Sequence, residues 1–405
     1  MYRDTYIEID TDIIKENIKN IIDNSDDYKY YIGVVKGNAY GYGEYISKYL
    51  VTSGINYLAV SNLEEGISVR KYVKDTPILC LEPIDIKYID KALEENITLC
   101  INNYDYYLAV KKLTKKVKFH LKLNTGMNRL GINDKDTVTK IFNDSMASSN
   151  MVLEGIFTHV STSGVYDIYY NRQVNKFKEL VSDIDLSKIK IVHLGRSCCL
   201  DFHPKIDICN GIRIGIMMYG VGSTFPNFNG LSGYLRKAKL SFFRKKNNLP
   251  PINLTRKINV KGALSLYSTV IDIQKANPGE TVGYGTKYIT KSYCNIAVIP
   301  LGYADGISTH YKDLYVKINN QEYPVIGSIN MGMITILVDE KVHLGDKVTV
   351  IDKNISYKSY GQKFSTGPYV FLTSLRRELP RRYMVKGKLE KEVTYYEWFL
   401  SCPRR

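Results

Sequence analysis

The sequence predicts a parallel α/β barrel of the TIM type, (β/α)8, followed by a mainly β domain. From Tyr30 to about Gly220, strand-like apolar runs alternate with helical patterns, as in successive βα units. From Val260 onward, the pattern changes to short alternating strands separated by turns. Between these regions lies a stretch broken by prolines and glycines. We therefore expect three parts: a barrel (1–220), an interdomain segment (221–257) and a β domain (258–405).

The first part begins with a strand-like alternation at Tyr6–Ile9, and Asp10–Asp12 can cap the helix that follows. Helical stretches such as Leu63–Val73 and Asp167–Ile184 then separate the apolar runs. Eight runs are enough to close a parallel barrel, whose reactive side chains lie at the C-terminal strand ends. The expected strands are Tyr30–Lys36, Tyr57–Val60, Pro77–Leu81, Ile97–Ile101, Val117–Leu123, Val152–Thr158, Ile189–Leu194 and Gly211–Gly215.

The interdomain segment is basic. It contains no acidic residue, and none occurs anywhere between Asp207 and Asp272. We expect an extended connection that forms a solvated basic loop, while an arm for nucleic acid or for a membrane surface is the alternative. Its basic residues are Arg236, Lys237, Lys239, Arg244, Lys245, Lys246, Arg256 and Lys257.

The last part (258–405) is predicted to be a sheet of short strands. Asn277-Pro278-Gly279, Asn319-Asn320 and Gly345-Asp346 provide turns, and one helical piece is expected near Tyr369–Arg377. The expected strands are Ser265–Ile273, Asn295–Pro300, Leu314–Ile318, Tyr323–Ile326, Ile334–Val338 and Lys347–Ile351.

Composition narrows the functional classes. The 405 residues are 44% hydrophobic and 24% charged, which is typical of a globular protein. The net charge is +15, but the basic residues are mostly scattered along the chain, and no nucleic-acid-binding motif is found. We therefore favour the interpretation that the charge attracts anionic small molecules. The seven cysteines lack zinc spacing, and the N-terminus lacks the apolar core of a signal peptide. We expect a cytoplasmic protein without a metal, a nucleic-acid partner or a membrane partner.

Lys36 ends the first barrel strand, just before a glycine-rich turn. A desolvated lysine amine at such a strand end can attack a carbonyl, as a Schiff-base lysine does, whereas the alternative is a lysine that reaches into solvent. The string Val34-Val35-Lys36-Gly37-Asn38-Ala39-Tyr40-Gly41-Tyr42-Gly43 closely resembles the cofactor-lysine motif of the alanine racemase family, which combines a barrel with a second β domain. The resemblance implies that Lys36 carries pyridoxal 5'-phosphate and that Tyr40 donates a hydrogen bond to its phosphate.

A second motif ends another strand. The string Phe119-His120-Leu121-Lys122-Leu123-Asn124-Thr125-Gly126-Met127-Asn128-Arg129-Leu130-Gly131 resembles the family's second long motif, with Asn124 in place of the usual aspartate. The resemblance implies that Lys122 is carboxylated on its ε-nitrogen and orients Arg129. Arg129 would then bind the cofactor's phenolic oxygen and the substrate carboxylate, which suits a guanidinium fork. The alternative for Lys122 is a lysine paired with an acid.

Three further strings resemble pocket segments of the family: Gly155-Ile156-Phe157-Thr158-His159, His193-Leu194-Gly195-Arg196-Ser197 and Ile212-Arg213-Ile214-Gly215-Ile216-Met217-Met218-Tyr219-Gly220. They imply that His159 reaches the pocket, that Ser197 binds phosphate and that His193 supports the arginine below the ring. Arg196 replaces the family's asparagine. The amides of Gly215 and Ile216 would cradle phosphate.

Arg213 would face the pyridine nitrogen of the cofactor. An arginine keeps its proton, so the ring would stay neutral and withdraw fewer electrons, which limits side reactions such as transamination.

In the β domain, Thr281-Val282-Gly283-Tyr284-Gly285 resembles the segment of the second catalytic base, and Pro300-Leu301-Gly302-Tyr303-Ala304-Asp305-Gly306 resembles the segment at the pocket entrance. The resemblance implies that Tyr284 acts in the active site of the other subunit of a homodimer, helped by His159 and Arg213. The alternative is an ordinary turn tyrosine, in a chain that has 34 of them.

Two segments depart from the family. Asn330-Met331-Gly332 stands where the family reads Cys-Met-Asp, and it keeps Met331, whose amide is expected near the substrate carboxylate. Arg377 is expected at the position of a phosphate-binding tyrosine.

Together these features predict a homodimeric racemase of small-molecule amino acids. Lys36 and Tyr284 would act on opposite faces of the substrate Cα. L-alanine and D-alanine are the expected pair, supplying D-alanine for peptidoglycan. The alternatives are a racemase of serine or of several small amino acids, a non-catalytic carrier of the same cofactor, a decarboxylase of similar plan, or an inactive relative. Carrier proteins lack a β domain, and the glycine-rich phosphate string and cysteine motif of the decarboxylases are not found.

Overall fold

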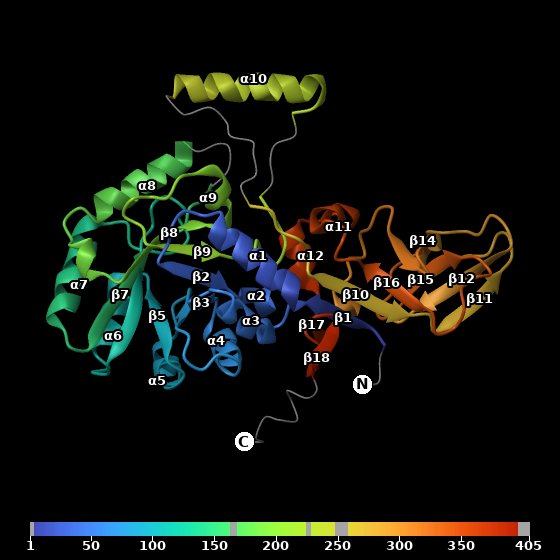
Figure 1. The fold of residues 1–405 in the computed structure, drawn as a ribbon, viewed down its shortest axis with the longest axis horizontal. Helices are drawn as coiled ribbons and strands as arrows, with labels where there is room; N and C mark the ends of the chain where they lie inside the picture. Colours follow the sequence, from blue (N-terminus) through green and yellow to red (C-terminus); the bar gives the residue numbers. More distant parts are fainter. Residues whose placement is uncertain (1–3, 163–167, 224–227, 248–257, 396–405) are drawn as a thin grey trace.

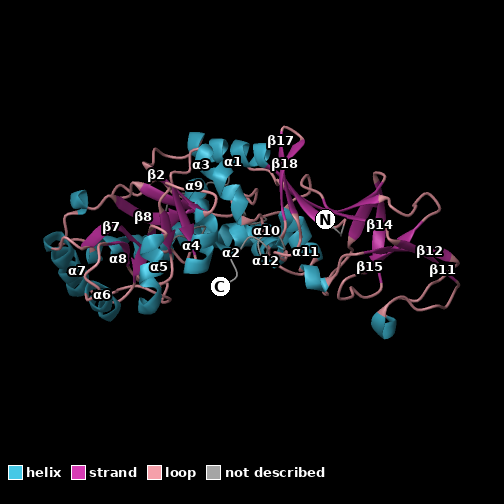
Figure 2. Ribbon diagram, turned by 90° about the horizontal axis from the view of Figure 1, so that it is seen from below, coloured by secondary structure: helices cyan, strands magenta, loops and turns pink. Residues whose placement is uncertain are grey.

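The computed structural model describes residues 4–162, 168–223, 228–247 and 258–395. A closed barrel and a large, mostly antiparallel sheet lie at opposite ends of the long axis, and α1 (Thr11–Asp23) lies between them (Figure 1). Figure 2 shows the same two parts from below, with helices concentrated around the barrel and strands in the other part. The predicted fold class is therefore confirmed.

Eight parallel strands close the barrel in chain order, and the last strand pairs with the first. Their side chains are almost all buried, because helices cover the outside of such a barrel while side chains fill its interior. The strands are β2 (Tyr30–Val34), β3 (Tyr57–Val60), β4 (Ile78–Cys80), β5 (Ile97–Ile101), β6 (Val117–Lys122), β7 (Met151–Phe157), β8 (Ile191–Arg196) and β9 (Gly211–Ile214).

Four helices of this part begin where the sequence provides a capping side chain. Asp10 caps α1, as predicted, and Asn62, Asn103 and Asp134 each accept a hydrogen bond from the first turn of the next helix. The helices that follow the barrel strands are α2 (Lys36–Tyr40), α3 (Ser47–Thr52), α4 (Leu63–Arg70), α5 (Ile89–Glu94), α6 (Tyr104–Lys111), α7 (Lys135–Ala147), α8 (Ile168–Leu180) and α9 (Ser197–Phe202).

The second sheet has ten strands in the order β11-β12-β15-β14-β13-β16-β10-β1-β17-β18. Its N-terminal member is β1 (Tyr6–Asp10), which pairs with β10 and β17. The predicted barrel range 1–220 therefore needs a correction, because its first strand belongs to the second sheet. The other members are β10 (Leu264–Thr269), β11 (Asp272–Ala276), β12 (Cys294–Ile299), β13 (Tyr315–Ile318), β14 (Gln321–Ile326), β15 (Ile334–Val338), β16 (Lys347–Ile351), β17 (Arg381–Val385) and β18 (Lys388–Val393).

Three details of this part differ from expectation. The single strand expected at Ser265–Ile273 is two strands, β10 and β11, which pair with different neighbours. The hairpin of β17 and β18 was not predicted. Two short helices, α11 (Tyr357–Lys363) and α12 (Pro368–Ser374), stand where one helical piece was expected.

The interdomain segment contains a helix, α10 (Gly230–Lys246), so the expectation of an extended connection is wrong for these 17 residues. The stretches 224–227 and 248–257 lie outside the described residues. None of the helices in the described part of the chain has the length and apolar content needed to cross a bilayer.

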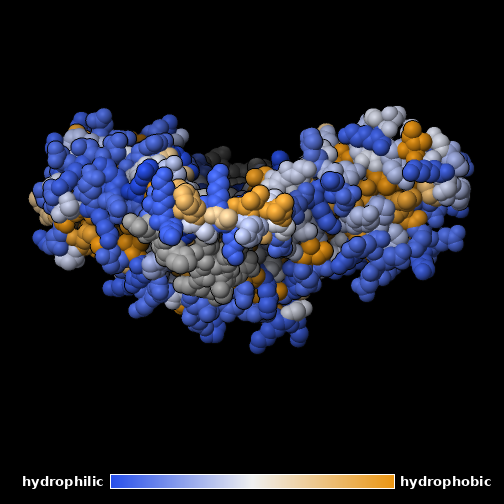
Figure 3. Space-filling model, turned by 90° about the horizontal axis from the view of Figure 1, so that it is seen from above, coloured by the Kyte–Doolittle hydropathy of each residue, from blue (hydrophilic) through white to orange (hydrophobic). Residues whose placement is uncertain are grey.

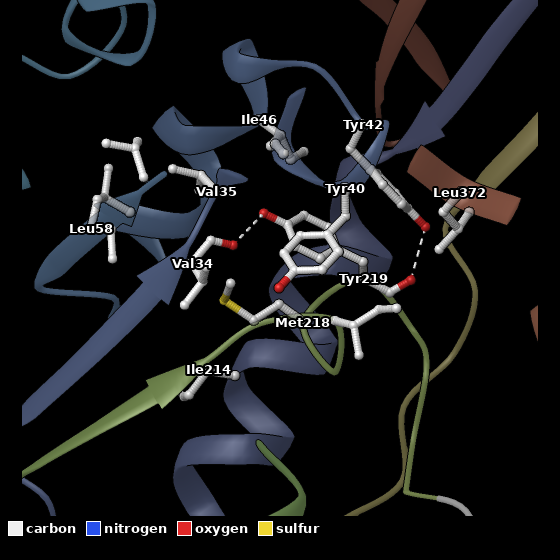
Figure 4. Packing of buried hydrophobic residues seen from close by; sticks show 14 of the residues in the cluster. Val34, Val35, Tyr40, Tyr42, Ile46, Leu58, Ile214, Met218, Tyr219 and Leu372 are labelled. Atoms are coloured by element: carbon white, nitrogen blue, oxygen red, sulfur yellow. Dashed lines mark hydrogen bonds between the residues drawn. The ribbon is translucent and has the colours of Figure 1, made fainter. Parts of the chain in front are cut away.

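Buried aromatic residues pack directly beneath the turn that follows Lys36 (Figure 4). The Tyr42 hydroxyl donates a hydrogen bond to the Tyr219 carbonyl at 2.9 Å, and the two rings are 4.9 Å apart. The Tyr42 hydroxyl also lies 2.9 Å from the hydroxyl of Tyr357, in α11. The core of the barrel is therefore continuous with the helices of the second part at this point.

Candidate active site

A cavity of about 710 Å³ opens at the C-terminal ends of the barrel strands. Most of the residues predicted to form the site line it, although they come from strands far apart in the sequence. These residues are Lys36, Tyr40, Lys122, Arg129, His159, Ser197, Arg213, Gly215 and Ile216. The position agrees with the general location of reactive groups in such barrels.

The turn after Lys36 is left-handed. Gly37, Asn38, Ala39 and Tyr40 have φ between +49° and +62°, a conformation that costs non-glycine residues about 1–2 kcal/mol each. The side chain of Glu65 supports the start of this turn, since it accepts hydrogen bonds from the Gly37 amide at 2.6 Å and the Ser61 amide at 2.9 Å. The strained turn is thus held by specific partners, as is common at functional sites.

Gly41 allows α12 to approach this turn closely. Its φ is +86°, and a Cβ atom there would lie 2.1 Å from the Leu372 carbonyl oxygen. Any larger residue would push α12 away, so a glycine is required both by the backbone conformation and by the packing.

Hydrogen-bond donors converge at one end of the cavity. The Gly215 amide donates to the Ser197 hydroxyl at 2.9 Å, and a Cβ atom on Gly215 would lie 2.8 Å from the Tyr40 hydroxyl. Burial raises the pKa of Tyr40, so this hydroxyl keeps its proton and can donate. The buried Nε atom of Arg196 has no hydrogen-bond partner among the described atoms. This end of the cavity therefore offers two hydroxyls, a glycine next to them and an unsatisfied cationic donor. Such a set of groups suits the phosphate of pyridoxal 5'-phosphate.

Arg213 is buried below the cavity and is held in one orientation. It donates hydrogen bonds to the carbonyls of Thr158 at 2.7 Å, Leu194 at 2.8 Å and His193 at 3.0 Å. Burial lowers its pKa to about 10, so the guanidinium is still cationic at neutral pH. The arginine can therefore face a ring nitrogen as a fixed cation.

A chain of polar side chains continues from Arg213 into the barrel interior. Arg213 Nη1 lies 2.6 Å from His193 Nδ1, and His193 Nε2 lies 2.9 Å from His120 Nδ1. Since arginine can only donate, His193 accepts through Nδ1 and carries its proton on Nε2. His120 then carries its own proton on Nε2, which lies 3.6 Å from Glu154 Oε2. Burial lowers the pKa of both histidines, which keeps them neutral.

Glu154 ends this chain at the other end of the barrel. Its carboxylate accepts hydrogen bonds from Tyr57 at 2.8 Å and from Lys190 at 3.0 Å. Burial acts to raise the pKa of Glu154, but His120, Tyr57 and Lys190 outweigh it, and the pKa is lowered. His120 and Glu154 were not predicted as functional residues. The signal for His120 was available, because residues 120 and 122 of one strand point to the same face.

His159 lies above Arg213 and is neutral. Burial, followed by the charge of Arg213, lowers its pKa to about 2. Its Nδ1 lies 3.4 Å from Arg213 Nη2, so it accepts there and carries its proton on Nε2. His193, by contrast, does not line the cavity but lies behind Arg213, as the predicted supporting role requires.

Lys122 is buried in the cavity wall, and burial lowers its pKa. Its Nζ lies over the Phe157 ring, 5.5 Å from the centroid. No carboxylate of the described residues forms an ion pair with it, so the alternative of an acid-paired lysine finds no support there. The lowered pKa favours the uncharged amine, which is the form that reacts with carbon dioxide, and Arg129 lies exposed nearby.

Tyr284 and Met331 lie outside this cavity, on the second sheet's loops, with exposed fractions of 77% and 62%. Their segments contact one another: the Ser328 hydroxyl donates to the Tyr284 carbonyl at 2.8 Å, and the Ala304 amide donates to the Met331 carbonyl at 2.9 Å. Within one chain, therefore, the predicted second base is not brought to Lys36.

The expectation for Arg377 is wrong. Arg377 is paired with Glu44 at 2.8 Å and does not line the cavity. The tyrosine at the cavity is Tyr369 of α12, whose ring lies 6.3 Å from the ring of Tyr40. Tyr369 was not predicted as a site residue, because the phosphate-binding position was expected in the segment 375–381.

No group of three or more His, Cys, Asp or Glu residues is placed to hold a metal ion in the described part of the chain. The six cysteines that the structure describes are unpaired.

Comparison with known proteins gives a consistent result. Residues 9–223 match the alanine racemase N-terminal domain and residues 263–383 match the alanine racemase C-terminal domain. An alanine racemase of Macrococcus caseolyticus is 29% identical over 400 residues, which cover 96% of this chain and 97% of that protein. The structure of a Clostridium difficile alanine racemase superimposes with a TM-score of 0.84 at 26% identity, covering 98% and 99% of the two chains. That of a Bacillus anthracis alanine racemase with bound L-Ala-P gives 0.82 at 27% identity, covering 98% and 99%.

Proposed function

The chain belongs to the alanine racemase family, and we propose that it interconverts L-alanine and D-alanine with pyridoxal 5'-phosphate as its cofactor. The observation that carries the proposal is the cavity that joins Lys36, the Tyr40–Ser197–Gly215 cluster and the cationic Arg213. The cofactor, when bound, supplies an electron-withdrawing ring that weakens the Cα–H bond of an amino acid.

The described residues divide the binding tasks among them. Tyr40, Ser197 and the amides of Gly215 and Ile216 would hold the phosphate, and Lys36 would hold the carbonyl end. Arg213 would face the ring nitrogen without giving up a proton, since its pKa stays near 10. A ring nitrogen that gains no proton would take up less negative charge. Return of the proton to Cα would then be favoured over side reactions.

Racemisation needs proton transfer at both faces of Cα. We assign one face to Lys36 Nζ. The other face goes to the Tyr284 hydroxyl of the partner subunit in a homodimer, and the high exposure of Tyr284 and Met331 supports this. His159 carries its proton on Nε2, so it would donate to the Tyr284 oxygen and stabilise its deprotonated form.

Arg129 would bind the substrate carboxylate, together with the Met331 amide of the partner subunit. We include carboxylation of Lys122, because its lowered pKa leaves an amine that can react with carbon dioxide and then orient Arg129. The proposal also includes the supply of D-alanine for peptidoglycan in the cytoplasm, which agrees with the unpaired cysteines.

Serine is the second candidate substrate, and Asn330 and Gly332 are the observation behind it. Compared with the family's Cys-Met-Asp, Gly332 removes a charge and Asn330 adds an amide beside Met331. A non-catalytic carrier is disfavoured, since the chain has the second sheet and an exposed Tyr284.

The test is chiral chromatography of a panel of L-amino acids incubated with the purified protein and added cofactor. D-alanine should form fastest, with D-serine next. If no D-amino acid forms from any member of the panel while the cofactor is bound, the racemase proposal is wrong. The Lys36→Ala variant is the control for turnover by contaminating enzymes.

A further inference from the structure

α10 carries a stripe of exposed apolar side chains. Leu231, Leu235, Ala238 and Phe242 are spaced by three or four residues and therefore lie on one side of the helix, with Tyr234 beside them. The exposed fractions are 79% for Leu231, 61% for Leu235 and 71% for Phe242. Single exposed leucines are ordinary on protein surfaces, but a continuous apolar row marks a surface for docking.

The opposite side of α10 is buried. Leu240, Gly233 and Arg244 are all shielded from solvent, and a Cβ atom on Gly233 would lie 2.3 Å from the Phe228 backbone. The helix is therefore turned so that its apolar stripe faces away from the rest of the chain. Figure 3, a view from the side on which α10 projects, shows apolar residues in a row across the centre, beside hydrophilic ones.

Basic side chains lie next to this stripe. Lys239 follows Leu235 by four residues, and Lys245 and Lys246 follow Phe242 by three and four, so each lies one helical turn from a stripe residue. Arg236 and Lys237 are exposed as well. No acidic residue compensates these charges within the helix or anywhere between residues 207 and 272.

We propose that α10 binds the surface of an anionic lipid bilayer, with its apolar stripe in the boundary between headgroups and acyl chains. An exposed apolar stripe edged by lysines is the pattern of helices that lie in a membrane interface. The lysine stems can lie along the stripe while their amines reach the phosphate groups. This inference does not depend on the racemase activity.

Two other partners fit less well. A second copy of the chain docked through α10 would place basic side chains against basic side chains, because this helix contains no acidic residue. A nucleic acid would satisfy the lysines, but it would leave Leu231, Leu235 and Phe242 in water. An anionic bilayer satisfies both the charges and the apolar stripe.

The first experiment is sedimentation of the full-length, cofactor-loaded protein with phosphatidylcholine vesicles, with and without phosphatidylglycerol. Several lysines near the surface contribute about 1 kcal/mol each, so binding should increase at least about tenfold with the anionic lipid. It should weaken at high salt, because the Debye length shortens. Absence of binding to the anionic vesicles at low salt overturns the proposal.

Two double substitutions separate the contribution of the apolar stripe from that of the basic side chains. Leu235→Asn with Phe242→Asn removes apolar area without changing charge, and Lys239→Gln with Lys246→Gln removes charge without changing the stripe. Each pair should reduce vesicle binding by at least about tenfold, while Lys275→Gln with Lys341→Gln, exposed lysines of the C-terminal part, should leave it unchanged. Racemase activity in solution should be the same in all three.

Two outcomes would assign the helix to another partner and so overturn the proposal. The first is a lower particle mass of the Leu235→Asn, Phe242→Asn variant in light scattering, with no vesicle binding by the wild type. The second is binding of a duplex RNA by the wild type, lost in Lys239→Gln with Lys246→Gln, again without binding to vesicles.

Discussion

His193 Nε2 and His120 Nδ1 lie 2.9 Å apart inside the barrel, between strands β8 and β6. The contact links Arg213, below the cavity, to the carboxylate of Glu154 at the opposite end of the barrel. The proton positions of both histidines follow from it, since each accepts on Nδ1 and carries its proton on Nε2. Glu154, at the far end of this row of polar side chains, does not line the cavity.

The Glu154→Gln variant tests this row of polar side chains through the pH dependence of the protein's stability. The folded pKa of Glu154 is lowered, so the stability that its carboxylate contributes is present above the unfolded value of about 4.3 and is lost as the pH falls below it. We expect the variant to be less stable at pH 7 by about 1–3 kcal/mol. The difference in melting temperature from the wild type should stay nearly constant from pH 7 to about pH 5 and shrink as the pH falls further, toward about pH 2. A difference that does not shrink over this acidic range would contradict the assignment, and Lys190→Gln is the control for the outer ion pair.

Reduction with borohydride should fix the cofactor on Lys36. The amine lies at the strand end beside the Tyr40–Ser197–Gly215 cluster, which suits the phosphate. Mass spectrometry of the digested protein should place the label on the peptide that contains Lys36, and Lys36→Ala should abolish it. Labelling of another cavity lysine, Lys122, in the wild type would refute the assignment.

Gly41→Ala should destabilise the protein and weaken cofactor binding. The added Cβ meets the Leu372 carbonyl at 2.1 Å, in addition to the cost of a positive φ. Gly387→Ala is the matched control, because Gly387 also has a positive φ, +72°, but has open space around it. The control should lose about 1 kcal/mol and Gly41→Ala distinctly more, measured by thermal unfolding. Equal losses would show that α12 can move aside freely.

Tyr284→Phe should slow proton removal from one enantiomer of alanine by roughly 10²–10⁴-fold and from the other much less. Since the enantiomers have equal free energies, kcat/KM falls equally in both directions and cannot reveal this. The measurement is exchange of the Cα hydrogen with deuterated solvent, for each enantiomer separately. Tyr293→Phe, another exposed tyrosine of the same part, is the control. Equal small losses for both enantiomers would assign the second base to another group.

Asn330→Cys with Gly332→Asp should lower the ratio of kcat/KM for L-serine to that for L-alanine. The wild-type asparagine can donate to a substrate hydroxyl, and a site that pairs a hydroxyl discriminates against an analogue without it. Serine should therefore be accepted by the wild type at a sizeable fraction of the alanine rate. An unchanged ratio, or negligible serine turnover by the wild type, would show that these positions do not set specificity.

The barrel could be predicted because its strands are short apolar runs, buried on both sides, such as Tyr57–Val60. The hairpin of β17 and β18 could not, because Lys388–Val393 lies at an exposed edge and four of its six residues are charged, so it has no apolar face to detect. α10 was missed because the glycines and prolines around it suggested an extended chain.

Some residues of the candidate site could likewise be predicted from the sequence, and others could not. Lys36 and Arg213 stand at strand ends in recognisable strings, and the fold brings them together. His120 and Glu154 lie inside the barrel, where a polar residue becomes meaningful only once its partner on another strand is known. The role of Tyr284 depends on a second chain, so neither one sequence nor one folded chain can test it.

The pairing of β1 with β10 and β17 has a consequence for biosynthesis. The barrel strands end at Ile214, so the barrel can close on the emerging chain while β1 has no strand to pair with. After Ile214, at 5–20 residues per second, the ribosome needs roughly 2.5–10 s to reach β10 and roughly 8–33 s to reach β17. During that time the first strand of the nascent chain is an open edge beside a finished barrel, and chaperones that cover strand edges have their best opportunity there.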